Sequence, residues 1–85
     1  MTTQATTATL SNETVVSVGQ TVESPDGSMS ETIASINVLP IEGNKHGIRA
    51  LSLDTTYKVI VFSNGMEMTR CDFSRMVVSG QAIVK

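Results

Sequence analysis

The sequence contains one cysteine, Cys71, and one histidine, His46, which are the two side chains best suited to nucleophilic chemistry. A thiol beside an imidazole can act as a nucleophile, and a carboxylate such as Asp54 or Asp72 would then orient the ring. No sequence signature of a cysteine hydrolase surrounds either residue, and a lone cysteine in a strand is usually a small buried hydrophobe. We therefore expect no catalytic residues and no enzymatic activity.

Metal and phosphate sites are disfavoured by the same counts. One Cys and one His cannot supply the three or four ligands of a zinc site, and the acidic residues lack the alternating spacing of a calcium loop. Gly43 and Gly47 have three residues between them, whereas a phosphate loop has four and continues with Lys and Ser or Thr. The sequence therefore predicts no metal and no cofactor.

Size and composition limit the elements that can position these residues. The chain has 85 residues, of which 40% are hydrophobic and 16% charged, so we expect one small folded domain. No run approaches the roughly 20 apolar residues of a membrane span, and the Thr-rich start does not resemble a signal peptide. The formal net charge of −2 disfavours non-specific binding to nucleic acids or membranes. We expect a soluble cytoplasmic protein that does not bind membranes.

The N-terminal segment is poor in large apolar residues. Residues 1–13 contain Leu10 as their only such side chain after Met1, which is too little to offset the entropy of ordering the chain. We predict a flexible Thr-rich arm over 1–13 and a single small β domain over 14–85. The alternative is an arm that orders by pairing with a neighbouring subunit, because Thr has good strand propensity.

Residues 28–39 fit two patterns. Ser28 and Glu31 have the spacing of a capping box, which favours a helix near 29–39. The β-branched residues of 32–39 and the turn Ser-Pro-Asp-Gly at 24–27 favour a strand that completes a hairpin. We predict the strand and keep the helix as the alternative.

The clearest element is a hairpin over 57–71. A strongly strand-prone run at 57–62 is followed by Asn64 and Gly65, the pair typical of a two-residue type I′ turn. Such a turn places Val61 opposite Met68 and creates a buried face of Val59, Val61, Met66 and Met68. The other face is then a surface for partner binding, and it carries Lys58, Ile60, Phe62, Glu67 and Thr69.

The remaining segments complete a mainly β chain. We expect a strand at 48–53, a short turn at 72–75 in which Phe73 closes one end of the core, and one or two short strands within 76–84. The predicted fold is mainly β, a small curved sheet or partly open barrel of five to six short strands. The alternative is an α+β fold with the one helix near 29–39.

Without catalytic signatures, the sequence favours a non-enzymatic protein-binding or assembly module. Its size suits a small accessory protein of viral or mobile-element type that self-associates or docks on a larger protein, and we expect a homo-oligomer. The alternative is a small β-barrel that binds nucleic acid through the basic and aromatic segment 45–75. The residues assigned to that alternative are Lys45, Arg49, Tyr57, Lys58, Arg70 and Arg75.

Overall fold

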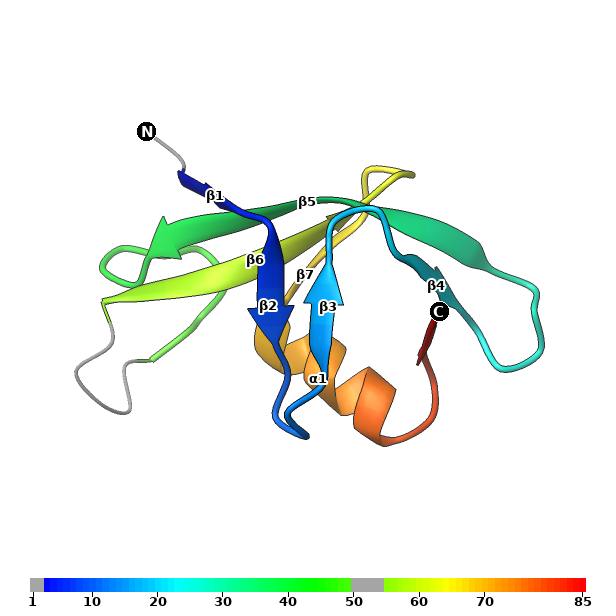
Figure 1. Ribbon diagram of the computed structural model, residues 1–85. Coiled ribbons are helices and arrows are strands. Elements are labelled where there is room, and N and C mark those ends of the chain that lie inside the picture. The colour runs from blue at the N-terminus through cyan, green and yellow to red at the C-terminus, as the bar shows by residue number, and fades with distance from the viewer. Residues whose placement is uncertain (1–2, 50–54) are drawn as a thin grey trace.

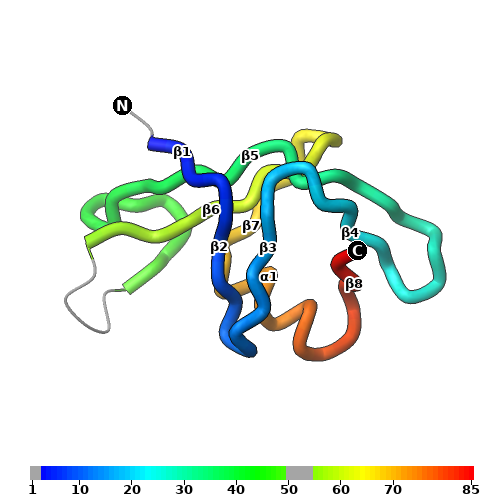
Figure 2. Tube along the Cα trace, viewed as in Figure 1, coloured from blue at the N-terminus to red at the C-terminus, as the bar shows by residue number. Residues whose placement is uncertain are grey.

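The computed structural model describes residues 3–49 and 55–85, which form eight strands and one helix (Figures 1 and 2). In chain order these are β1 Thr3–Ala5, β2 Thr7–Thr9, β3 Val15–Ser17, β4 Thr21–Glu23, β5 Ser30–Pro40, β6 Thr56–Phe62, β7 Glu67–Thr69, α1 Arg70–Val78 and β8 Ile83–Val84. The predicted mainly β fold is confirmed, as an open curved sheet rather than a closed barrel.

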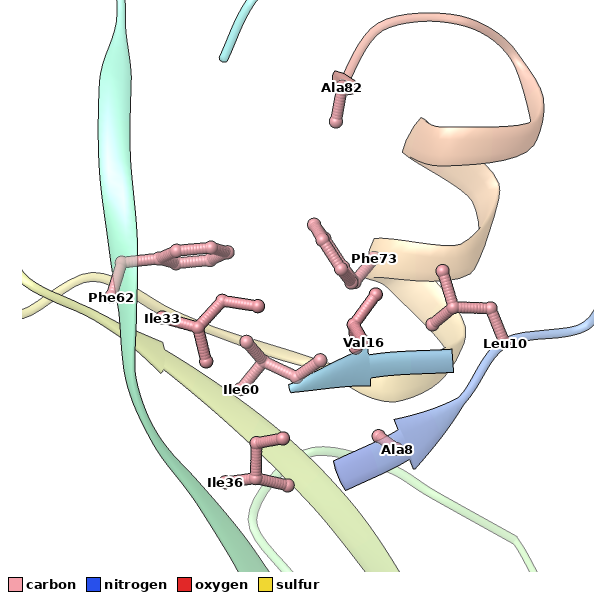
Figure 3. Close-up of a cluster of buried hydrophobic side chains, with 9 residues drawn as sticks. All are labelled: Ala8, Leu10, Val16, Ile33, Ile36, Ile60, Phe62, Phe73 and Ala82. Atoms are coloured by element: carbon pink, nitrogen blue, oxygen red, sulfur yellow. The ribbon is translucent and has the colours of Figure 1, made fainter. Parts of the chain in front are cut away.

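The main sheet is antiparallel and has the strand order β7-β6-β5-β4-β8, with β1 also paired to β5. Strands β2 and β3 form a separate two-stranded sheet, which crosses β5 and β6 in Figure 1. The hydrophobic core lies between this pair, the long strands and α1 (Figure 3). Its buried side chains are Ala8, Leu10, Val16, Ile33, Ile36, Ile60, Phe62, Phe73 and Ala82.

The N-terminal segment differs from the predicted flexible arm. Gln4 of β1 pairs with Asn37 of β5, and Ala8 of β2 pairs with Val16 of β3. Ala8 and Leu10 are both buried in the core. The alternation of small or apolar residues with Thr lets one face of β2 cover the core, so the segment orders within its own chain.

Residues 30–40 form the long strand β5, so the alternative helix near 29–39 is wrong. The turn before it is present as predicted, with the Gly27 N–H donating to the Ser24 carbonyl at 3.0 Å. Gly27 has a φ of 73°, a conformation that favours glycine. Ile33 and Ile36 then face the core opposite Phe62 and Ile60 of β6, because a strand paired on both edges can bury its β-branched residues.

The helix α1 replaces a turn and a strand in the predicted order of elements. Thr69 caps its start, and the Thr69 hydroxyl accepts from the Asp72 N–H at 3.3 Å. Phe73 is buried as predicted, and Met76 and Val77 pack on the same side at helical spacing. Residues 76–78 are therefore helical and not a strand.

The predicted strands within 76–84 and at 48–53 have different outcomes. Ile83–Val84 forms the short strand β8, paired with β4. Ile48 and Arg49 lie in no strand, and the rest of the strand predicted at 48–53 falls outside the described residues.

The predicted hairpin is formed by β6 and β7, but its register is shifted by one residue. Ile60 pairs with Met68 and Val61 with Glu67. The Phe62 N–H donates to the Met66 carbonyl at 2.8 Å, so the loop has three residues and not two. Gly65, with a φ of 86°, takes the left-handed position that ends such a loop.

Candidate functional site

The register shift removes the predicted partner-binding surface. Ile60 is 0% exposed, Phe62 is 7% exposed, and both face the core, while Thr69 is buried as the cap of α1. A one-residue shift moves every side chain of the returning strand to the opposite face. Glu67 therefore lies on the face opposite to Ile60, and Met68 joins Ile60 instead. The five predicted residues, Lys58 included, do not form one exposed surface.

The same shift brings methionines together at an opening of the core. A groove of about 90 Å³ lies between the β4–β5 hairpin, the β6–β7 hairpin and α1, and its lining is mainly apolar. We call it the methionine groove; its central lining residues are Met29, Met66, Met68 and Met76 with Phe62 and Phe73. Sequence reasoning missed this site because Met29 is distant in the chain and Met76 was assigned to a strand.

The floor of the methionine groove is made of buried aromatic rings, and its rim is exposed. Phe62 and Phe73 pack edge to face, with ring centroids 5.7 Å apart and an interplanar angle of 64° (Figure 3). Met29 is 51% exposed and Met66 47% exposed, whereas Met68 is half-buried against the core. The groove thus presents flexible apolar side chains over a fixed aromatic base.

Carboxylates line the edge of the methionine groove. Glu23 and Glu31 both contribute to its lining. The Lys85 ammonium lies 3.0 Å from the Glu23 carboxylate and offsets that charge. Glu31 accepts a hydrogen bond from the Ser63 hydroxyl, and no ion pair of the described residues includes it. The groove is therefore apolar inside and acidic at one edge.

A second cavity, of about 400 Å³, lies between the 41–49 loop, the end of β2 and the starts of β6 and α1. We call it the basic pocket; its lining includes Arg49, Tyr57, Lys58 and Arg70. These are four of the six residues predicted for nucleic-acid binding. The other two lie elsewhere, since Lys45 is exposed on the loop and Arg75 pairs with Asp72 at 3.5 Å.

The aromatic groups expected to stack on bases are not exposed platforms. Phe62 and Phe73 are buried against each other. Tyr57 is half-buried, and its ring meets the edge of the His46 ring with the centroids 5.5 Å apart. Base stacking, the main sequence-tolerant mode of binding single strands, therefore has no exposed aromatic surface on this chain.

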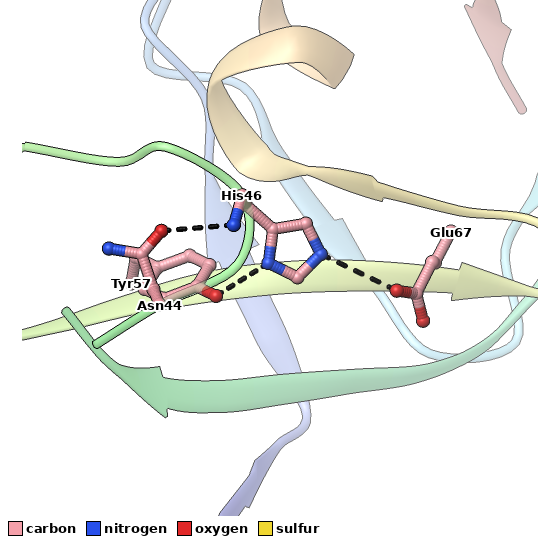
Figure 4. Close-up of polar contacts among 4 residues, drawn as sticks. All are labelled: Asn44, His46, Tyr57 and Glu67. Atoms are coloured by element: carbon pink, nitrogen blue, oxygen red, sulfur yellow. Dashed lines mark hydrogen bonds and ion pairs between the residues drawn. The ribbon is translucent and has the colours of Figure 1, made fainter. Parts of the chain in front are cut away.

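His46 fixes the 41–49 loop over the outer face of β6 (Figure 4). Its Nδ1 lies 2.6 Å from the Tyr57 hydroxyl, and its Nε2 lies 3.4 Å from the Glu67 carboxylate. The Asn44 side chain accepts from the His46 N–H at 3.0 Å and orders the loop. On this face of β6, Val59 lies between Tyr57 and Val61, the residue paired with Glu67, and it is buried. His46 thus has a structural role.

Neither a metal cluster nor a membrane-spanning helix is present in the part of the chain that the structure describes. Within residues 3–49 and 55–85, no cluster of three His, Cys, Asp or Glu could hold a metal ion, and no helix is long and apolar enough to cross a membrane. Hydrogen bonds from Ser24 and Ser28 lower the pKa of Asp26, in the exposed β4–β5 turn, from 3.8 to about 2.

Comparison with protein families, curated proteins and solved structures finds no match to this chain.

Proposed function

We propose that this chain is a non-enzymatic protein-binding module and that the methionine groove receives an apolar side chain of the partner. The observation that carries the proposal is the clustering of four methionines around a buried Phe62–Phe73 pair. Methionine is flexible and polarizable, so such a surface adapts to different apolar groups. Exposed apolar side chains that gather at a groove, rather than lie scattered, are typical of interaction sites.

The size of the methionine groove favours a protein partner over a small molecule. Its volume of about 90 Å³ is well below the roughly 300–1,000 Å³ of small-molecule sites. A groove of this size accommodates one anchoring side chain, and such central anchors supply most of the binding energy of protein interfaces. We therefore expect a peptide segment with a single large apolar anchor.

The edge of the methionine groove selects the charge of the partner. Glu31 lines this edge and has no cationic partner among the described residues, so a segment with Lys or Arg beside the apolar anchor is favoured. The chain itself has a net charge of −2, which makes a second copy a less complementary occupant. In the alternative, a second copy of this chain occupies the same groove and forms a homo-oligomer.

We further propose that the module acts in the cytoplasm. Cys71 is free and exposed at the start of α1. Free exposed thiols are typical of reducing compartments, where disulfides are rare.

Selection from a random peptide library on the immobilised chain tests the proposal. We expect enrichment of peptides with a Leu or Phe anchor flanked by Lys or Arg. Met66→Ser should abolish this enrichment, because Met66 is exposed at the groove and contributes little to folding. Val78→Ser is the matched control, since Val78 is 60% exposed on α1 outside the groove.

Two results would contradict the proposal. One is enrichment that survives Met66→Ser but not Val78→Ser, which would place binding on another surface. The other is a selection without any apolar consensus. The native mass of the unmodified chain then separates a partner from a second copy, because a stable oligomer that Met66→Ser dissociates would identify the chain itself as the occupant.

A further inference from the structure

The basic pocket is built on the outer edge of β2. The Val18 N–H donates to the Thr6 carbonyl at 3.0 Å, and the Leu10 N–H donates to the Thr14 carbonyl at 2.8 Å. Because alternate residues of a strand direct their backbone groups to opposite edges, Thr7 and Thr9 direct theirs away from β3. This edge has no neighbouring strand among the described residues.

Two cations cover this edge side by side. The Lys58 ammonium donates to the Thr7 carbonyl at 3.1 Å, and the Arg70 guanidinium donates to the Thr9 carbonyl at 3.1 Å. The two acceptors are two residues apart on one strand, about 7 Å along its axis. Lys58 and Arg70 flank the last pair of the β6–β7 ladder, Val59–Thr69, with Arg70 as the first residue of α1. Like charges held at this separation repel each other.

The described residues provide little compensation for these charges. Their ion pairs are His46 with Glu67, Arg75 with Asp72 and Lys85 with Glu23, none of which includes Lys58 or Arg70. Arg49 adds a third cation to the same lining. A bound anion between these groups would relieve the repulsion.

From this arrangement we infer that the basic pocket binds a phosphate ester of nucleotide size. A phosphate carries a charge of about −1.5 to −2, which matches paired cations better than a single carboxylate does. The cavity volume of about 400 Å³ lies within the range of small-molecule sites, unlike that of the methionine groove. This inference does not depend on the proposed protein-binding function.

The start of α1 contributes further donors to the pocket. Arg70 and Cys71 are the first residues of this nine-residue helix and both line the cavity. The Arg70 N–H faces Lys58 at the end of the β6–β7 ladder, which leaves the Cys71 N–H without an acceptor within the helix, and the helix dipole favours an anion at this end. The remaining lining offers the Thr56 hydroxyl and an apolar wall of Ile41 and Ile48, which suits the organic part of the ester.

Titration of the ¹⁵N-labelled chain with thymidine monophosphate tests the inference by NMR. We expect the amide signals of Thr9, Arg70 and Cys71 to shift and saturate, and the affinity to fall as the salt concentration rises. Thymidine should leave these signals unchanged. Arg70→Met should weaken binding about tenfold or more, because it removes a charge-assisted contact. Arg75→Met is the matched control, since Arg75 lies on the same helix outside the pocket.

Titration with oligothymidylate distinguishes a nucleic-acid strand from a free phosphate ester as the source of the phosphate. Oligothymidylate that binds more tightly than the monophosphate, with the same signals shifted, would identify a nucleic-acid strand as the source. Equal or weaker binding would identify a free phosphate ester. Arg70 also donates to the Thr9 carbonyl of β2, so its loss could prevent folding. If Arg70→Met does not fold, Arg49→Met is used instead. The inference is overturned if thymidine shifts the same signals, or if a folded variant binds like the wild type. Met66→Ser should leave this binding intact, which keeps the two proposals distinguishable.

Discussion

Substitution of Phe62 by Ala should strongly destabilise the chain, because this face of β6 lies against the core. Phe62 is 7% exposed and packs edge to face on Phe73. Buried Phe→Ala changes cost about 3–5 kcal/mol, of which the aromatic pair contributes about 0.5–1.5 kcal/mol. One edge of Phe62 reaches the methionine groove, so we expect a loss near the lower limit, about 3 kcal/mol. The total stability expected for 85 residues is about 4–13 kcal/mol.

Urea unfolding followed by far-UV circular dichroism measures this loss. Val61→Ala is the matched control, because Val61 is the adjacent residue of β6, half-buried on the opposite face. We expect it to cost about 1 kcal/mol, well below the cost of a fully buried residue. A double-mutant cycle with Phe62→Leu and Phe73→Leu should give a coupling of about 0.5–1.5 kcal/mol. A loss at Phe62 no larger than that at Val61, with no coupling to Phe73, would refute the burial of the Phe62 face of β6 and its packing on α1.

Three further substitutions or titrations test other parts of the structure. Leu10→Ala should cost about 3 kcal/mol in urea unfolding at every protein concentration, because Leu10 packs in the core of its own chain; a loss seen only when an oligomer dissociates would instead indicate strand exchange. Thr69→Ala should cost about 1 kcal/mol through loss of the α1 cap, and Thr69→Ser should restore most of it; equal losses would show that the hydroxyl does not cap the helix. The carboxyl ¹³C signal of Asp26 should titrate at about pH 2, because Ser24 and Ser28 stabilise the ionised form. Because the pKa is lowered, the stability that Asp26 gives to the folded turn is complete above its unfolded pKa of 3.8 and is lost as the pH falls through about 2. A titration midpoint near 3.8 would show that the hydrogen bonds from Ser24 and Ser28 are absent in solution.

The strands were predictable where local sequence alone determines them. The β-branched run of β6, the Ser-Pro-Asp-Gly turn before β5 and the Asn64–Gly65 loop each specify their backbone conformation through their own residue types. The register of the β6–β7 hairpin was not predictable in this way, because Asn-Gly fits both a two-residue turn and the end of a three-residue loop. Packing of Phe62 on Phe73 favours the longer loop.

The helix and the N-terminal strands depend on contacts that are distant in sequence. The apolar triplet Met76–Val78 has strand propensity, but Phe73, Met76 and Val77 bury one helical face against the core. Leu10 looks isolated in the sequence, yet the core is completed by it and by Ala8. Tertiary burial therefore overrides local propensity in both segments.

The candidate sites were predictable only in part, for the same reason. Four of the six residues predicted from the basic segment 45–75 line the basic pocket, because charge clustering is visible in the sequence. The methionine groove was not found, since Met29 and Met66 directly precede β5 and β7, Met76 lies in α1, and bringing them together requires the tertiary fold.

The central claim, that the methionine groove is the binding site, is tested most directly by NMR of the methionine methyl groups. The chain contains five methionines, and four of them line the groove. On titration with a peptide from the library selection, we expect the ¹³C-methyl signals of Met29, Met66, Met68 and Met76 to shift together with one dissociation constant. Bound peptide that leaves these four signals unchanged would contradict the proposed site.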